Sequence, residues 1–292
     1  MRVIKRYTAV MKKAEATISR AWWAVVIFFL LHGLIVATWV SRIPAVQSAL
    51  HLNNGVLGLC LLGIAIGSVA AIPVTGGLIV RHGSKCLTRW TTFGFCAALA
   101  LPAFAVNALT LTLSLVVLGV FAGAMDVSMN AHGVEVEKAL GKPTMSRFHA
   151  MFSIGGMVGA SIGGIVASRH IVPWLHFVPV VLICIAVAAW WAPALLDHEE
   201  ADHVVQEHRL PWNKIPPVLL ALSAIGFCIL LSEGAMADWI AVYLKQVLSA
   251  GPGTAAAGYA VFSAAMAIFR LLGDFITGRL GPARTVRAGS LV

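Results

Sequence analysis

Residues 22–40 read WWAVVIFFLLHGLIVATWV, an apolar run that one histidine interrupts. About 20 apolar residues in a helix cross the hydrocarbon core of a bilayer, so this stretch predicts a membrane-spanning helix. Strands that span membranes alternate polar and apolar residues, and this run does not alternate. The stretch therefore favours an all-α integral membrane fold.

The rest of the chain has the same character. Hydrophobic residues make up 59% of the 292 residues, and charged residues make up only 11%. A soluble domain is about 25% charged, so the composition excludes an ordinary soluble protein. Eight stretches are long and apolar enough to span a membrane. They are residues 21–40, 55–80, 90–106, 109–131, 149–168, 171–192, 215–243 and 254–276.

The lysine and arginine residues are divided unevenly between the two sides of these stretches. Seventeen lie on the side of the N-terminus, and three lie on the other side: Arg42, Arg169 and Lys245. Basic loops stay in the cytoplasm, so we expect the N-terminus inside. We therefore interpret the basic residues behind the net charge of +9 as orienting the chain in the membrane, and we expect no nucleic-acid partner.

Short segments recur about 200 residues apart. Residues 37–40 (ATWV) recur as residues 237–240 (ADWI), and the pattern R-x-G at 81–83 recurs at 279–281. These matches align the seventh stretch with the first and the eighth stretch with the second, so the repeating unit has six helices. Two parallel six-helix halves describe the major facilitator architecture.

The repeat divides the chain into four parts. A polar, acidic segment separates the two halves. Its histidines are five residues apart, a spacing that does not place them on one helical face, so we favour a solvated linker over a metal site. The second half stops after its first two helices, so we expect about 8 helices of 12 and a C-terminally truncated chain. The parts are a basic cytoplasmic tail (1–20), an N-terminal six-helix bundle (21–192), a cytoplasmic linker (193–214) and a partial C-terminal bundle (215–292).

The connection between the second and third stretches, GGLIVRHGSK at 76–85, resembles the major facilitator loop signature G-x-L-a-D-R-x-G-R-K. In the family this loop helps to hold one conformation. Val80 replaces the acid of the signature and Ser84 replaces an arginine, which puts the family's charge network in doubt. The candidate loop residues are Gly76, Arg81, Gly83 and Lys85, with Asp274, Arg279 and Gly281 in the second half.

Three further segments sharpen the resemblance: GAMDVSMNAHGVEVE at 123–137, SRFHAMFSIGG at 146–156 and SEGAMADW at 232–239. They resemble the YbjJ-type permease subfamily of the major facilitator superfamily and, more distantly, fucose permease. The resemblance implies a multi-pass secondary transporter of the bacterial inner (plasma) membrane.

The fifth stretch offers a rival resemblance. Its glycine pattern from Gly155 to Gly164 resembles the G-P-x-x-G-G motif of drug–proton antiporters, but Ala160 stands where proline belongs. Small residues at this spacing also let two membrane helices approach closely, and we favour that interpretation.

Acidic residues within membrane helices are costly and face a cavity or a partner. Asp126 and Asn130 lie one turn apart, and His149 begins the next stretch from the same side. A polar cluster of these three side chains is a candidate transport site. A structural hydrogen-bond clamp between the two helices explains them equally well.

Glu233 and Asp238 form the second acidic group, in the seventh stretch. We expect Glu233 to lie toward the outer side and to be the main candidate for proton or substrate coupling. We expect Asp238 to be a hydrogen-bond partner at the outer gate. Gly234 allows a bend there, as in the broken helices that line transporter cavities. In the eighth stretch we expect Arg270 near the inner end, paired with Asp274 four residues on.

Three ring side chains complete the candidates. His32 lies midway along the first stretch, and we expect a hydrogen-bonded packing residue, although histidine titrates near neutral pH and a proton relay stays open. Trp39 and its repeat counterpart Trp239 are interpreted as interfacial anchors. Stacking surfaces for a sugar-like substrate are the alternative.

No enzyme signature is found: the sequence has no HExxH, GxSxG, GxGxxG or Walker pattern. We expect no enzyme, no cofactor, no bound metal and no ATP-driven transport. The partners expected are the lipid bilayer, a small solute and protons. We predict a proton-coupled secondary transporter of a small polar, possibly sugar-like solute. The alternatives are drug-type proton antiport and a truncated remnant that does not transport.

Overall fold

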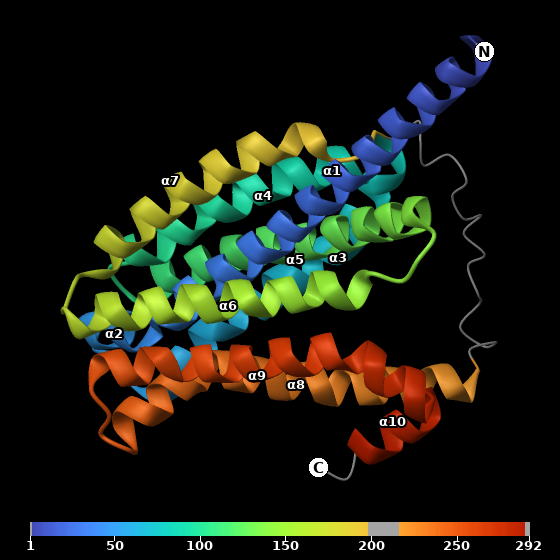
Figure 1. The fold of residues 1–292 in the computed structure, drawn as a ribbon. Coiled ribbons are helices and arrows are strands. Elements are labelled where there is room, and N and C mark those ends of the chain that lie inside the picture. The colour runs from blue at the N-terminus through green and yellow to red at the C-terminus, as the bar shows by residue number, and fades with distance from the viewer. Residues whose placement is uncertain (1, 198–215, 290–292) are drawn as a thin grey trace.

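The computed structural model describes residues 2–197 and 216–289, and all regular structure in these ranges is helical (Figure 1). Most of the predicted linker and its histidines lie outside the described residues. In chain order the elements are α1 Arg2–Val40, α2 Ile43–Ala49, α3 Asn54–His82, α4 Ser84–Ala100, the 3-10 turn η1 Leu101–Phe104, α5 Ala108–Leu140, α6 Met145–Ser168, α7 Pro173–Trp191, the 3-10 turn η2 Ala192–Ala194, α8 Pro217–Gln246, α9 Pro252–Leu280 and α10 Pro282–Gly289.

The helices begin where the sequence places suitable residues. The side chain of Asn53 accepts a hydrogen bond from the Val56 amide at the start of α3. Asn107 and Thr110 form a reciprocal capping box at the start of α5. Proline stands in the first turn of α7, α8 and α9, where its missing amide hydrogen costs nothing.

Seven helices of the described part are long and apolar enough to cross a membrane. The third predicted stretch, residues 90–106, is not among these seven and falls on α4 and η1. α4 has only 17 residues, and basic residues and threonines interrupt its apolar pattern. It nevertheless packs beside α5 and α7 within the bundle (Figure 1). The predicted tail is continuous with the first span, because α1 runs unbroken from Arg2 to Val40.

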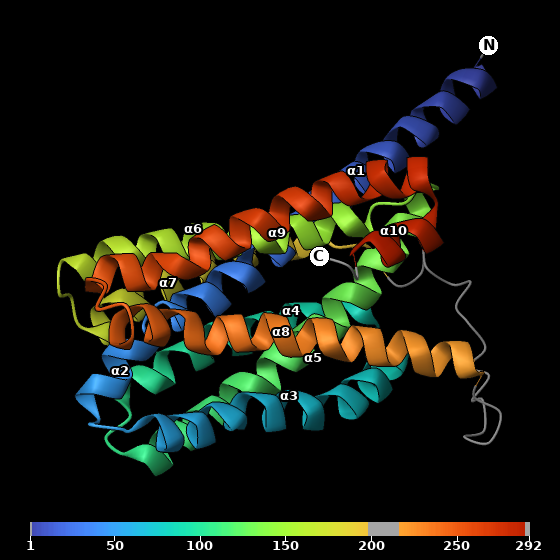
Figure 2. The same cartoon turned by 90° about the horizontal axis from the view of Figure 1, so that it is seen from below.

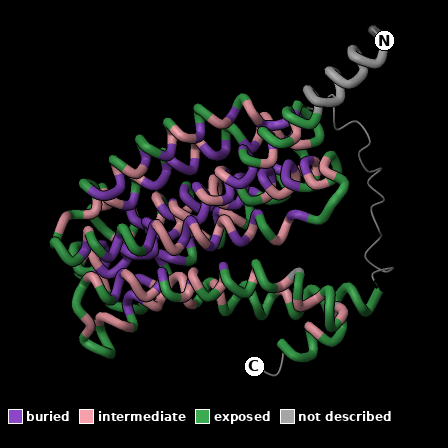
Figure 3. The backbone as a smooth tube through the Cα atoms, viewed as in Figure 1, coloured by how far each residue is buried: buried purple, intermediate pink, exposed green. Residues whose placement is uncertain are grey.

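The helices form a bundle of α1 and α3–α7, with α8 and α9 lying along one side of it (Figures 1 and 2). α6 packs against α1 on one face and against α9 on another, while α3 packs on α5. Buried residues concentrate in the first bundle, and the beginning of α8 is exposed (Figure 3). α6 therefore connects the two groups of helices.

Glycines on α6 explain its close approach to α1. A Cβ added at Gly155 would overlap the carbonyl oxygen of Leu30, and one at Gly163 would overlap the hydroxyl of Ser41. At Gly159 the added atom would lie 2.6 Å from a carbonyl oxygen of α1. The interpretation of this glycine pattern as a helix-packing ridge is confirmed.

The repeat is visible in the backbone. Gly83 and Gly281 both have φ of 79°, and His51 and Ser249 both have φ of 53°. Each pair is separated by 198 residues, and α3 and α9, which lie between these turns, both have 29 residues. The repeat read from the sequence is therefore confirmed for these helices, including the left-handed turns that begin and end them.

Candidate functional site

A cavity of about 260 Å³ lies between the first bundle and α8. Its walls are largely apolar and include Phe95 and Trp39. Asp238 lines it from α8, one turn beyond Gly234. Trp39 is 3% exposed, and its indole Nε1 has no hydrogen-bond partner in the described part of the chain. The cavity thus combines an acid, an unpaired N–H donor and two aromatic rings.

The burial of Trp39 corrects the prediction of an interfacial anchor, because an anchor must reach the lipid headgroups. Trp239 is only partly buried and packs on α3, where a Cβ on Gly58 would lie 3.4 Å from its ring. The two repeat-related tryptophans therefore both contact protein, and only Trp39 lines the cavity.

A charged pair lies near the middle of α8 and α9. Arg270 Nη2 lies 3.2 Å from Glu233 Oε1 and 3.4 Å from Oε2. Arg270 Nη1 donates to Ser153 Oγ at 2.7 Å and to the carbonyl oxygen of His149 at 3.3 Å, both on α6. About a quarter of each charged side chain is exposed, 23% for Arg270 and 27% for Glu233. This central ion pair thus joins α8, α9 and α6.

The pairing corrects one prediction. Glu233 was expected toward the outer side and Arg270 near the inner end, whereas contact between them requires the same depth. The sequence analysis did not foresee the contact of Arg270 with Glu233 on α8, and the predicted i, i+4 pairing of Arg270 with Asp274 is untested. The side chain of Asp274 lies outside the described residues, so its role stays a prediction. α8 is one continuous helix through Gly234.

The predicted cluster of Asp126, Asn130 and His149 is only partly assembled. Asn130 Nδ2 donates to the carbonyl oxygen of Asp126 at 2.8 Å and to its Oδ1 at 3.2 Å. His149 instead packs edge-on against Phe29, with ring centroids 5.2 Å apart, and its carbonyl oxygen accepts from Arg270. The Asp126–Asn130 pair is therefore local to α5, and His149 belongs beside the central ion pair.

His32 is 5% exposed and packs edge-on against two rings, Phe95 at 5.1 Å and Phe152 at 5.4 Å between centroids. Its Nδ1 has no hydrogen-bond partner among the described residues, so the expected hydrogen bond is absent at this atom. Phe95 also lines the cavity, which places His32 directly behind the cavity wall.

One end of the bundle carries a polar contact that the sequence analysis missed, between the segment of α2 and α3 and the end of α8. Gln246 Nε2 donates to Gln47 Oε1 at 3.1 Å, and Asn54 Nδ2 donates to Gln246 Oε1 at 2.9 Å. Lys245 Nζ donates to Ser48 Oγ at 2.7 Å. The only sequence signal is that Gln47 and Gln246 stand 199 residues apart, close to the offset of the repeat.

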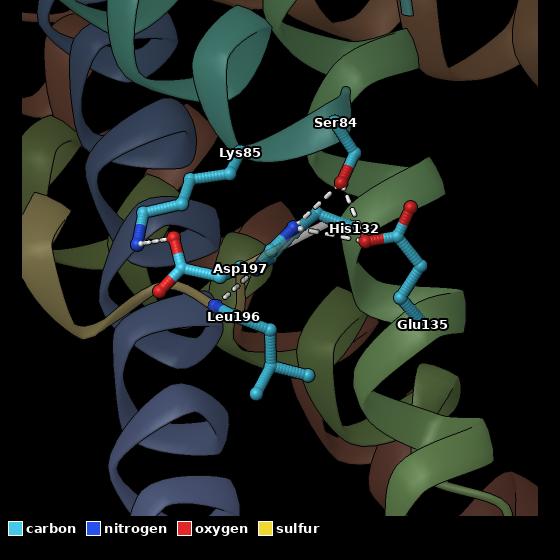
Figure 4. Close-up of polar contacts among 6 residues, drawn as sticks. All are labelled: Ser84, Lys85, His132, Glu135, Leu196 and Asp197. Carbon is cyan, nitrogen blue, oxygen red and sulfur yellow. Dashed lines mark hydrogen bonds and ion pairs between the residues drawn. The ribbon is translucent and has the colours of Figure 1, made fainter. Parts of the chain in front are cut away.

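The opposite end carries a second polar cluster, around the turn between α3 and α4 (Figure 4). The Leu196 amide donates to Nε2 of the buried His132 at 3.2 Å. That bond leaves the proton of a neutral ring on Nδ1, which lies 2.7 Å from Ser84 Oγ. Ser84 Oγ in turn donates to Glu135 Oε2 at 2.6 Å. The donors therefore point in one direction from Leu196 to Glu135.

This arrangement is not that of a nucleophile and its base. Ser84 and Glu135 both approach Nδ1 of His132, and the other ring nitrogen is occupied by a backbone amide. A general base must have one nitrogen on the nucleophile and the other on an orienting group. The cluster holds residues 196–197 against the bundle instead, and Lys85 Nζ adds an ion pair to Asp197 at 2.8 Å.

The loop-signature residues play unequal parts. Gly83 ends α3 with a positive φ of 79°, and Lys85 forms the ion pair just described. Arg81 is exposed, and an added Cβ at Gly76 would meet nothing within 4 Å. In the second half Arg279 lies over the ring of Phe275, 4.2 Å from its centroid.

Comparison with known proteins gives a consistent picture. Residues 18–292 match the family model described as Major Facilitator Superfamily. The chain is 34% identical to the uncharacterized transporter y4wD of Sinorhizobium fredii over 91% of its length and 70% of that protein. It is 36% identical to an uncharacterized MFS-type transporter of Yersinia pestis, over 90% of the chain and 67% of that protein.

Two further matches are more distant. The chain is 30% identical to the membrane protein MosC of Rhizobium meliloti, over 88% of the chain and 62% of that protein. The crystal structure of the nucleoside transporter NupG superposes with a TM-score of 0.61 at 14% identity, over 89% of this chain and 68% of that one. At that identity the likeness concerns the fold.

Proposed function

Because the chain belongs to the Major Facilitator Superfamily and is a multi-span membrane transporter, we propose that it carries a small polar solute by secondary transport coupled to protons. The observation that carries this proposal is the cavity between the first bundle and α8. It lies where two repeats meet, and it presents one acid and one unpaired donor within an apolar wall. Such a lining is typical of small-molecule sites.

The same lining favours a sugar-like solute. The Asp238 carboxylate accepts hydrogen bonds from hydroxyl groups, the Trp39 indole donates one, and aromatic rings cover apolar faces of a sugar. The largely apolar wall also suits a hydrophobic cation opposite Asp238, which keeps drug-type efflux as the second candidate. The motifs at 123–137, 146–156 and 232–239 support a placement among YbjJ-type permeases.

For proton coupling we propose Glu233. Its carboxylate pairs with Arg270, while the other hydrogen-bond partners of Arg270 in the described part of the chain come from α6 of the first bundle. Protonation would remove the charge of Glu233 and leave Arg270 its hydrogen bonds to α6. The proton would thereby change which helices the central ion pair joins, as coupling between two moving halves requires.

For orientation we propose that the end with the Gln47–Gln246 contact faces the periplasm and that the Ser84–His132 cluster faces the cytoplasm of a bacterial inner membrane. The uneven distribution of lysine and arginine supports this assignment. In the described conformation the polar contact between α2 and α8 then holds the outer end of the two halves together.

Uptake by proteoliposomes tests the proposal. A panel of labelled hexoses, polyols and nucleosides is offered under an imposed proton gradient. We expect accumulation of at least one solute by the wild type, loss of gradient-driven accumulation with retained binding in Glu233→Gln, and loss of binding in Asp238→Asn. Glu15→Gln, which changes an exposed acid, is the matched control. Accumulation that survives collapse of the gradient would rule out proton coupling.

A further inference from the structure

A second cavity, of about 300 Å³, lies at the end of the bundle near α2. It is lined by the segment from Ser41 to Ala49, by the α6–α7 turn and by residues of α8 and α9, including Lys245 and Ala255. It shares no lining residue with the cavity that contains Asp238. Its size falls at the lower end of the range for small-molecule sites.

Arg42 is the residue that gives this cavity its chemistry. The side chain is 3% exposed, although it carries a full positive charge. Its Nη2 donates to the carbonyl oxygen of Ile171, but Nε and Nη1 have no hydrogen-bond partner in the described part of the chain. A carbonyl group is neutral, so this one bond leaves the charge uncompensated.

The lining offers nothing to balance that charge. It contains no aspartate or glutamate and adds a second cation, because Lys245 lies at the cavity with its Nζ on Ser48 Oγ and the Pro44 carbonyl oxygen. His170 lines the cavity as well. A buried cation is stable only when an anion or several acceptors surround it. Two cations and no acid therefore give the lining a charge that suits an anion.

We propose that this cavity binds a small oxyanion, a carboxylate or a phosphate, between Arg42 of the first bundle and Lys245 of α8. The Arg42 guanidinium and the Lys245 ammonium, from two residues that line the cavity, donate to it. An anion there touches both groups of helices and strengthens their contact at this end. The site is separate from the proposed solute cavity, so its failure would leave the proposed function unaffected.

Thermal unfolding of the purified full chain in detergent tests the site. Inorganic phosphate or acetate is added to a chloride buffer at constant ionic strength. At a hundred times Kd we expect the unfolding midpoint to rise by about 5 °C in the wild type. Arg42→Gln should lose this rise, and Lys245→Gln should weaken the apparent affinity by about fivefold or more. Arg169→Gln removes an exposed basic residue from the α6–α7 turn and should behave as the wild type.

The stability of the variants without added oxyanion is a second readout. Arg42→Gln removes a buried charge that has no acidic partner among the described residues, so it should unfold no earlier than the wild type under these conditions. A rise with phosphate alone identifies a free inorganic anion, and a rise with acetate identifies a carboxylate ligand. No rise with either probe overturns the proposal, as does a rise that persists in Arg42→Gln or disappears in Arg169→Gln.

Discussion

Replacing Arg270 should destabilise the protein more than replacing Glu233, although the two side chains form one ion pair. In the described part of the chain all hydrogen bonds of Glu233 come from Arg270, whereas Arg270 also binds Ser153 and the carbonyl oxygen of His149. Glu233→Gln keeps an acceptor opposite the guanidinium. Arg270→Gln leaves a carboxylate and a serine hydroxyl without their donor.

The magnitude follows from the burial of the pair. Breaking a fully buried ion pair costs about 3–5 kcal/mol, and a surface pair contributes about 0–1 kcal/mol. With 23% and 27% exposure, we expect about 1–2 kcal/mol for Glu233→Gln and about 3 kcal/mol for Arg270→Gln, which also loses two hydrogen bonds to α6. The double variant should be at least about 1 kcal/mol more stable than the sum of the single effects predicts.

The assay is reversible unfolding in mixed detergent micelles, followed by tryptophan fluorescence. The four proteins of the double-mutant cycle are measured in one denaturant series. Effects that add within about 0.5 kcal/mol would show that the two side chains do not interact. Equal destabilisation by the single variants would show that the contacts of Arg270 with α6 contribute nothing.

Three further predictions concern the rest of the fold. Gly155→Leu should abolish folding or destabilise the protein by more than about 3 kcal/mol, because the added Cβ overlaps the backbone of α1. Gly76→Leu, whose added Cβ meets nothing, should change the free energy of unfolding by no more than about 0.5 kcal/mol. Denaturant unfolding measures both variants. His132→Ala should lower the free energy of unfolding by about 2 kcal/mol and speed proteolysis after Leu196, because the Leu196 amide loses its acceptor. An unchanged rate of cleavage would contradict the role of the cluster. In a background without native cysteines, Ser48→Cys should be cross-linked to Lys245 by a short thiol-to-amine reagent, and Lys245→Gln should abolish the resulting change in gel mobility.

The sequence predicts the spans and the repeat because both depend on local patterns. A run such as 22–40 is apolar whatever packs against it, and the turns at Gly83 and Gly281 each need a residue that accepts positive φ. The span count differs at α4, because its neighbours bury a helix that is less apolar than the others.

The candidate site is less predictable, since its contacts join residues far apart in the chain. The i, i+4 rule applies only to partners on one helix, so it predicts Asp274 as a partner of Arg270. It cannot predict a contact with Glu233, which lies 37 residues away on another helix. His132 meets a residue 48 positions before it and another 64 positions after it. Such meetings depend on helix packing, which hydropathy does not encode.

The contact between Gln47 and Gln246 joins two side chains of the same kind at nearly equivalent places in the two halves. The two residues stand 199 positions apart, one position from the 198-residue offset of the repeat, so amide side chains meet from both sides of the contact. Each amide offers both a donor and an acceptor and carries no net charge. Water can therefore replace each partner, and the contact can break and form again without the desolvation penalty of a buried ion pair.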